Sequence, residues 1–223
     1  MPSILIIGAE RGLGLGLAQV LHRSGWTVTG TSRSGSDTSD LLKVAHVAHV
    51  DVTRREQIEP LRDSISSFDV IFCVAGIYGP LHNSVVEATD AELTAIMMTN
   101  CFGPIRLAHR LLDRLNDGGT LAVMSSHRAS IALNTEAGLK LDLYRASKVA
   151  LNMLARTIHA DSGVTVLSLH PGWAATAMGT LDGSVEAEIS VEESVEGLAR
   201  ILMANMGCGE HRFLDWRGES LPW

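Results

Sequence analysis

The sequence predicts an α/β protein that forms one domain over residues 1–223, with helices covering both faces of a central parallel sheet. Short runs rich in β-branched residues alternate with longer amphipathic segments along the whole chain. No linker, repeat or low-complexity tract divides the chain, and 223 residues lie within the usual size of one such domain. Because crossovers between parallel strands are right-handed, we expect a doubly wound Rossmann fold of about seven strands.

The first half of the chain supplies strands separated by two helices. Apolar runs predict strands at 3–7, 26–32, 44–50 and 68–76. Helical periodicity predicts helices at 13–25, which Gly25 ends, and at 54–65, where Pro60 should bend or shorten the helix. The polar stretch 32–40 follows a strand and is predicted to be a loop.

The second half repeats this alternation with longer helices. Helical periodicity predicts helices at 90–115, 141–161 and 191–205. Apolar runs predict strands at 118–126, 164–170 and 211–216.

Composition restricts the partners of the protein. A net charge of −7 argues against a nucleic acid as the main partner. No apolar run approaches the ~18 residues that a membrane span requires, so no membrane association is expected. The three cysteines, Cys73, Cys101 and Cys208, are odd in number and lack C-x-x-C spacing. They predict reduced thiols and a cytoplasmic location.

The nine histidines do not form a recognisable metal motif. The chain has neither H-E-x-x-H nor paired Cys and His spacing. His46 and His49 lie three apart in a predicted strand and should point to opposite faces. We therefore predict no metal site.

A glycine-rich loop follows the first predicted strand and opens the first predicted helix. Gly8, Gly12 and Gly14 have the spacing G-x-x-x-G-x-G, with Leu13 between the last two, and the commoner G-x-G-x-x-G is missing. Amide N–H groups at such a helix start can bind a pyrophosphate, and glycines let it approach closely. The alternative is a bare turn before a helix. Gly16 lies outside the pattern and is expected to serve packing.

Tyr144 and Lys148 form a Y-x-x-x-K pair at the start of a predicted helix. Residues four apart share a helix face, so the ammonium should lie near the phenol. A free tyrosine, with a pKa near 10, is a poor acid or base at neutral pH. A nearby lysine cation is expected to lower that pKa and to make the phenol a usable general acid or base. The alternative is a surface contact between the two side chains.

These two motifs resemble those of the short-chain dehydrogenase/reductase family. The family's catalytic serine aligns with Ser126 rather than Ser125, and strand alternation places these two serines on opposite faces. The resemblance implies that Ser126 binds the substrate carbonyl. It also matches Asn100, followed by Gly103, with the family's helix asparagine, which helps to hold a water near the lysine. A polar residue satisfied within a helix is the alternative for Asn100.

Further matches follow in the family's order. Asp51-Val52 resembles the segment whose Asp contacts the adenine amino group. Ala75-Gly76 matches the end of the family's N-N-A-G, but Cys73 and Val74 replace both asparagines, which puts their usual support of the central strand in doubt. The resemblance implies that the loop after 164–170 holds the nicotinamide carboxamide through Pro171, Gly172, Trp173 and Thr176.

The residues within and around these motifs are similar to those of a C-factor-like branch of the family. This branch contains small carbonyl reductases and proteins named for a developmental signal. The gap of 18 residues between Ser126 and Tyr144 is longer than is usual. The insertion, around 132–143, is expected to shape the substrate mouth. The short segment 176–190 suggests an open site with a broad carbonyl range. The resemblance also implies a homodimer or homotetramer that pairs through the Tyr-bearing helix and its neighbour.

Two arginines favour NADP(H) over NAD(H) as the cofactor. No acidic residue ends the second predicted strand, where one would bind the ribose 2′-OH and repel a 2′-phosphate. Arg33 stands there instead, and Arg11 lies in the glycine loop, so both can reach a 2′-phosphate. Two solvated surface arginines are the alternative.

The resemblance implies an oxidoreductase that interconverts a carbonyl compound and an alcohol by hydride transfer. Tyr144 is expected to be the acid or base, assisted by Lys148, Ser126 and Asn100. The resemblance also implies that Tyr144 and Lys148 contact the cofactor. The alternative is a protein of the same fold that senses NADP(H) and regulates a partner without turnover.

Overall fold

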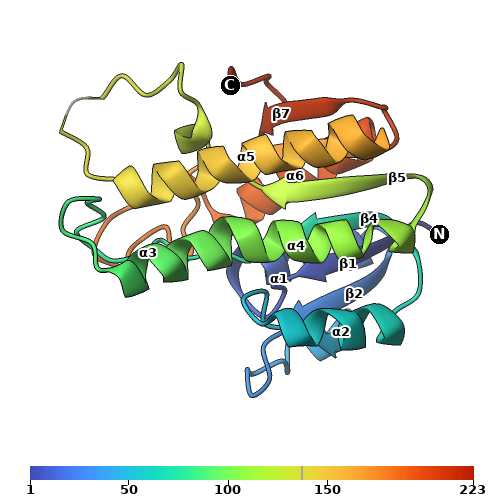
Figure 1. Ribbon diagram of the computed structural model, residues 1–223. Coiled ribbons are helices and arrows are strands. Elements are labelled where there is room, and N and C mark those ends of the chain that lie inside the picture. The colour runs from blue at the N-terminus through green and yellow to red at the C-terminus, as the bar shows by residue number, and fades with distance from the viewer. Residues whose placement is uncertain (137) are drawn as a thin grey trace.

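The computed structural model describes residues 1–136 and 138–223, and its strands form one parallel sheet (Figure 1). The sheet has seven strands in the order β3-β2-β1-β4-β5-β6-β7. The strands are β1 (Ser3–Ile7), β2 (Thr27–Ser32), β3 (His46–His49), β4 (Phe68–Cys73), β5 (Leu115–Met124), β6 (Thr165–His170) and β7 (His211–Asp215). This confirms the predicted doubly wound fold.

Helices cover both faces of this sheet. They are α1 (Gly12–Arg23), α2 (Ile58–Ser64), α3 (Asp90–Met97), α4 (Gly103–Arg110), α5 (Asp142–Ser162) and α6 (Val191–Asn205). In Figure 1, α4 and α5 lie in front of the strands and α1 and α6 behind them. Short 3₁₀ turns occur at Leu41–Lys43, Arg55–Gln57, Leu112–Arg114 and His127–Ala129.

Strand alternation divides the apolar core into two clusters. On β1, Ile4 and Ile6 join the cluster that contains residues of α1 and α6. Leu5 and Ile7 face the other way and join the cluster that contains residues of α2, α4 and α5. Because successive strand residues point to opposite faces, one continuous apolar strand serves both layers.

The chain reverses its direction across the sheet at β1. This strand pairs with β2 on one side and with β4 on the other, so the connections that follow β1 and β4 run in opposite directions across the sheet. Open α/β sheets bind their ligands outside the carboxyl ends of the strands at such a point. The glycine loop after Ile7 and the segment after Cys73 both begin there.

The helix predicted over 90–115 is interrupted by one π-helical turn and ends early, at Arg110. α3 ends at Met97, a π-helical turn, η3, spans Met98–Phe102, and α4 starts at Gly103. Pro104 stands at the start of α4, where its missing N–H cannot continue the regular bonding of the preceding turn. Apolar periodicity alone could not locate this change, because it continues through the π-helical turn.

The strand predicted at 118–126 starts earlier and ends earlier. β5 begins at Leu115, which pairs with Phe68, and the register then shifts before Val70 pairs with Thr120. Gly118 lies within this irregular start with a φ of +73°. Met124 is the last strand residue, so both serines of the predicted site follow the strand.

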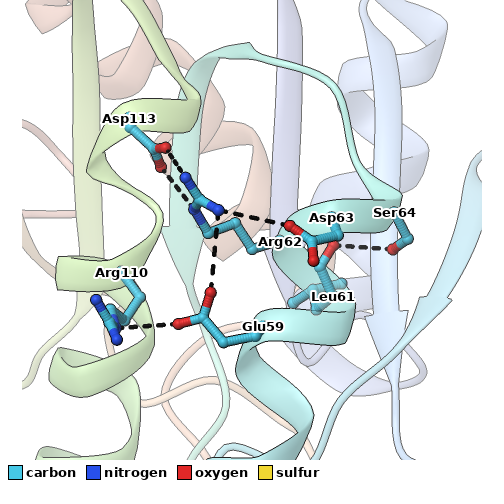
Figure 2. A network of polar contacts seen from close by, with 7 residues as sticks. All are labelled: Glu59, Leu61, Arg62, Asp63, Ser64, Arg110 and Asp113. Carbon is cyan, nitrogen blue, oxygen red and sulfur yellow. Dashed lines mark hydrogen bonds and ion pairs between the residues drawn. The ribbon is translucent and has the colours of Figure 1, made fainter.

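Pro60 shortens its helix, which is one of the two outcomes, bending or shortening, that the sequence predicts. It is the third residue of α2, in the first turn, where a missing N–H removes no bond within the helix. Figure 2 shows how this helix is tied to its neighbour: Arg62 pairs with Asp113 after α4, and Glu59 pairs with Arg110 on α4, at 3.1 Å. These side chains are partly exposed, so each pair contributes no more than about 1 kcal/mol.

Candidate active site

The glycine loop makes a tight turn between β1 and α1. Gly8 and Gly12 have φ angles of +87° and +55°, which L side chains rarely adopt. A Cβ on Gly14 would lie 2.0 Å from the carbonyl oxygen of Gly8, so the helix packs directly on the turn. Leu13, between them, is partly buried against the core. In the described chain, the first turn of α1 has no acidic residue and no side-chain cap. Its amide N–H groups are therefore available to an anion.

A pocket of about 390 Å³ opens after β2 and β3. It is lined by Arg33, Ser34, Gly35, Ser36, Asp51, Arg54 and Gln57. Partial burial alone would raise the pKa of Asp51, but hydrogen bonds from Thr53 and the charges of Arg33 and Arg54 lower it below its usual range. Arg11 is not among the described residues that line this pocket. Arg54 was not predicted from the sequence, although its position directly after Asp-Val-Thr was a signal.

The loop after β6 approaches the glycine loop. A Cβ on Gly12 would lie 3.5 Å from Cγ2 of Thr176, so residues about 160 positions apart in sequence meet here. The Thr176 hydroxyl accepts a hydrogen bond from Gly179 N. The Pro171 carbonyl accepts one from Ser194 on α6, at 2.6 Å, and Gly172 has a φ of +75°. The indole of Trp173, which is 42% exposed, donates to the Gly179 carbonyl.

The segment after β4 completes this edge of the site. The amide of Ala75 donates to the Ile7 carbonyl, at 2.9 Å, which holds the segment against the glycine loop. A Cβ on Gly76 would lie 3.3 Å from Oδ1 of Asn100 and 3.5 Å from Nζ of Lys148. Val52, at the end of the segment after β3, is buried. Nearly all the predicted cofactor residues therefore gather at the carboxyl ends of the strands.

Tyr144 and Lys148 lie together on the first turns of α5. The Lys148 ammonium lies 5.7 Å from the centre of the Tyr144 ring and donates to the Met124 carbonyl, at 2.8 Å. Burial raises the pKa of Tyr144 to about 12, although a hydrogen bond with Ser126 acts in the opposite direction. Burial lowers the pKa of Lys148 to about 8. The pKa of Tyr144 is therefore raised rather than lowered as the sequence predicted, and burial is the largest cause.

Ser126 and Ser125 point in different directions. Ser126 follows β5 and lies close enough to Tyr144 to lower the pKa of its phenol, and the Ser126 hydroxyl accepts a bond from Arg128 N at 3.1 Å. Ser125 is buried and donates to Oδ1 of Asn152 within α5, at 2.7 Å. Only Ser126 therefore lies beside the phenol.

Asn100 is fully buried in the π-helical turn η3. Its Oδ1 accepts from Ile77 N, at 2.7 Å, and its Nδ2 donates to the Ile77 carbonyl and to the Ser147 hydroxyl. Ser147 in turn donates to the Tyr144 carbonyl, at 2.8 Å. The asparagine thus connects the segment after β4 to the helix that carries Tyr144, and π-helical turns are frequent at functional sites.

A pair of histidines links the Ser126 turn to the loop after β6. Nδ1 of His127 and Nε2 of His170 lie 2.9 Å apart. Burial, with the nearby charge of His127, lowers the pKa of His170 from 6.5 to about 3. Burial also lowers the pKa of His211, on β7, to about 3. Both imidazoles are therefore neutral in the folded protein at neutral pH.

Acidification from about pH 7 toward about pH 4 should lower the free energy of unfolding. The unfolded chain protonates His170 and His211 near pH 6.5, whereas the folded chain protonates them only near pH 3. The unfolded state therefore binds more protons across this range and gains stability as the pH falls. Urea unfolding at several pH values measures the effect. His170→Asn should make the free energy of unfolding depend less on pH. His22→Asn, at an exposed position, should leave that dependence unchanged. An equal pH dependence in the wild type and in His170→Asn would contradict the prediction.

The described part of the insertion borders the Ser126 turn. Glu136 pairs with Arg128, and Lys140 pairs with Glu87 at 3.4 Å. The amide of Ala132 donates to the carbonyl of the last residue, Trp223, at 3.3 Å. Ala137, within the predicted insertion, lies outside the described residues.

The donor set fits a dinucleotide better than a metal ion. The glycine turn, the uncapped helix start and the arginine-lined pocket follow one another along one edge of the sheet. Among residues 1–136 and 138–223, no group of three or more His, Cys, Asp or Glu side chains could hold a metal ion. Over the same residues, no helix is both long and apolar enough to cross a membrane.

The chain matches a family model and is similar to known proteins over most of its length. A family model described as enoyl-(acyl carrier protein) reductase matches residues 8–202, from the glycine loop into α6. The chain is similar to C-signal of Myxococcus xanthus, with 32% identity over 160 residues that cover 70% of this chain and 92% of that protein. This similarity supports the resemblance to a C-factor-like branch.

Two solved structures are similar over the full chain. A carbonyl reductase from Pseudomonas aeruginosa PAO1, in complex with NADP, is 35% identical, with a TM-score of 0.89 and 100% of both chains covered. A short-chain dehydrogenase/reductase from Burkholderia multivorans, with bound NADP, is 33% identical, with a TM-score of 0.91 and 100% and 99% of the two chains covered.

Proposed function

This chain belongs to the short-chain dehydrogenase/reductase family of oxidoreductases, and we propose that it interconverts a ketone or aldehyde and an alcohol with NADP(H). The observation that carries the proposal is the cluster of Ser126, Tyr144 and Lys148 beside Gly76, at the edge of the sheet where the glycine turn also lies. The carbonyl reductase named above, which binds NADP, supports this reaction class by similarity.

The cofactor residues that we propose fall into four groups along the carboxyl edge of the sheet. The chemistry that bound NADP(H) supplies is hydride transfer to or from the reacting carbon. The residues that would hold it are Gly8, Arg11, Gly12, Leu13 and Gly14; Arg33, Asp51 and Val52; Ala75 and Gly76; and Pro171, Gly172, Trp173 and Thr176.

The side chains near Tyr144 act on the oxygen of the substrate. In the reduction direction, the hydroxyl groups of Ser126 and Tyr144 hold the carbonyl oxygen. Tyr144 then gives its proton to that oxygen as negative charge develops on it. With a pKa of about 8, Lys148 is mostly protonated at neutral pH, and its charge stabilises the phenolate that remains. Asn100 holds the segment at Ile77 and is proposed to assist the return of the proton.

The phenol of Tyr144 is protonated at neutral pH, because burial raises its pKa above the ordinary value. It therefore carries the proton that reduction requires, and the nearby charge of Lys148 is proposed to ease the release of that proton. In the oxidation direction the same group must first lose its proton, which becomes easier as the pH rises.

A panel of aldehydes, ketones and quinones with NADPH tests the proposed reaction. NADPH consumption with any member, at a rate above that of Tyr144→Phe, supports the enzyme. NADPH binding without turnover across the panel would instead favour a sensor of NADP(H). The described residues 176–190 fold into short turns, which is compatible with a broad range of carbonyl compounds.

Arg33→Ala and Arg54→Ala should each weaken NADPH binding by about tenfold or more, because charge-assisted bonds to a phosphate are strong. Both arginines line the pocket after β2. The dissociation constant for NADH, which lacks the 2′-phosphate, should stay unchanged. Calorimetric titration of both cofactors measures the difference.

Arg23→Ala is the matched control, because it removes a positive charge at the far end of α1. It should leave both dissociation constants unchanged. If Arg33→Ala weakened the binding of NADPH and of NADH equally, this arginine would not bind the 2′-phosphate.

We further propose a homodimer or homotetramer that pairs through α4 and α5. Met153 on α5 is 65% exposed and offers an apolar contact to a second copy. The free cysteines, of which Cys73 and Cys101 are buried, are compatible with the proposed cytoplasmic location. The proposed partner is a small carbonyl or alcohol substrate rather than a nucleic acid or a membrane.

A further inference from the structure

We propose that Asn83 is the positioning residue for the general acid: it caps the helix that carries Tyr144 from a loop 61 residues earlier in the chain. The inference rests on the proposed function, because it concerns the placement of the proton donor. Asn83 lies outside the family motifs identified from the sequence.

Within the described residues, the N-cap residue of helix α5 makes no side-chain capping bond. This residue is Leu141, whose side chain cannot accept a hydrogen bond. The first amide N–H groups of a helix have no partner within it and need an outside acceptor. Asn83 provides two: its carbonyl accepts from Leu143 N, at 3.4 Å, and its Oδ1 accepts from Tyr144 N, at 3.0 Å. One residue therefore satisfies the amides of the second and third helical positions.

The loop that carries Asn83 holds this side chain rigidly. Asn83 is fully buried and has a φ of +46°, a conformation in which Asn is one of the few tolerated side chains. Its Nδ2 donates to the carbonyls of Tyr78, at 2.9 Å, and Pro80, at 3.4 Å, and its own N–H donates to the Pro80 carbonyl. All the polar groups of Asn83 are therefore used, and none reaches solvent.

The same network places a second ring against Tyr144. Tyr78, whose carbonyl binds Asn83, lies with its ring centre 6.1 Å from that of Tyr144, and the ring planes differ by 25°. Next to Asn83, the amide of Val85 donates to the carboxylate of Asp142, the first residue of α5. The loop thus contacts the first three residues of the helix.

Loss of the Asn83 side chain should affect Tyr144 more than Lys148. Tyr144 is in the first turn, which frays most easily without a cap. Lys148 lies one turn further and is held separately through the Met124 carbonyl. The expected consequence is a proton donor that is misplaced while the cofactor residues stay in position.

The experiment compares Asn83→Gly, Asn83→Asp and Ser190→Ala in the full chain. Glycine removes the side chain but adopts the same backbone freely, so it tests the cap without adding strain. Aspartate keeps an oxygen acceptor, which the start of a helix favours. Ser190 caps α6, on the opposite face of the sheet, by accepting from Glu193 N at 3.0 Å. Ser190→Ala therefore removes a comparable cap from a helix that does not carry the general acid, Tyr144.

We expect Asn83→Gly to lower kcat by about ten- to a hundredfold with an unchanged dissociation constant for NADPH, because small misplacements of reacting groups are costly. Asn83→Asp should also lower kcat, because its buried carboxylate keeps an acceptor for Tyr144 N but loses the Nδ2 bonds to the carbonyls of Tyr78 and Pro80. Ser190→Ala should keep the kcat of the wild type. An unchanged kcat in Asn83→Gly would overturn the proposal.

A second readout requires neither substrate nor cofactor. The chain contains only two tyrosines, so carbon-13 labelling of the tyrosine rings gives two sets of NMR signals, and Tyr78→Phe assigns the set of Tyr144. Asn83→Gly should shift or broaden the Tyr144 signals, and Ser190→Ala should leave them in place. Unchanged Tyr144 signals in Asn83→Gly would refute the positioning role even if no substrate were found. Absence of turnover in the wild type would instead count against the proposed function alone.

Discussion

Replacing Tyr144 by phenylalanine should lower kcat for carbonyl reduction by about a hundred- to ten-thousandfold, the usual contribution of a general acid. The substitution removes only the hydroxyl, and the ring keeps its place between Tyr78 and Lys148. Binding of NADPH should therefore change little. Steady-state kinetics with the best substrate of the panel, together with an NADPH titration, measure both quantities.

Tyr78→Phe is the matched control for this experiment, because it removes the other phenol of the chain from a ring that stacks on Tyr144. Its kcat should stay close to that of the wild type. Full activity of Tyr144→Phe would exclude Tyr144 as the acid. If Tyr144→Phe also lost NADPH binding, the Tyr144 hydroxyl of the wild type would serve to bind the cofactor rather than to donate the proton.

Gly14→Ala should destabilise the protein by about 3 kcal/mol or more and abolish tight NADPH binding. An added Cβ would lie 2.0 Å from the Gly8 carbonyl oxygen and 3.0 Å from Cα of Ala9. Both contacts are with backbone, so the helix must move away from the turn rather than a side chain adjusting. Urea unfolding and an NADPH titration measure the two effects.

Gly16→Ala, in the same helix, is the comparison. A Cβ there would meet Cγ1 of Val195 at 3.2 Å and Cγ1 of Val191 at 3.3 Å, which are side-chain atoms. Alanine also favours a helix interior over glycine by about 1 kcal/mol, so the net effect should be small. If Gly14→Ala bound NADPH as tightly as the wild type, close packing of the helix on the turn would not be required for the cofactor.

The fold was predictable because each strand carries its own signal. Apolar runs such as Ser3–Ile7 are buried on both faces, which only a covered parallel sheet provides. The spacing of the glycines also located the turn where the chain reverses across the sheet. The break of the predicted helix 90–115 was not predictable, because the apolar periodicity continues through the π-helical turn around Asn100.

The site was predictable to the extent that its residues form local patterns. Tyr144 and Lys148 are four apart on one helix, so their proximity follows from helix geometry alone. Arg54 directly follows Asp-Val-Thr, but only the fold brings it to the pocket that Arg33 lines. Asn83 forms no local pattern and joins the site through a contact that is distant in sequence. The pKa of Tyr144 depends on the burial of its phenol, which spacing does not determine.

The sequence by itself therefore determined the order of strands and helices, the glycine turn and the Tyr–Lys pair, because each depends on residues only a few positions apart. Only the tertiary structure decided the burial of the Tyr144 phenol, which second arginine joins Arg33, and what caps the Tyr144 helix. The physical reason is that burial and long-range hydrogen bonds depend on which segments the fold brings together. Asn83 contacts Tyr144 only because the loop between β4 and α3 meets the first turn of α5.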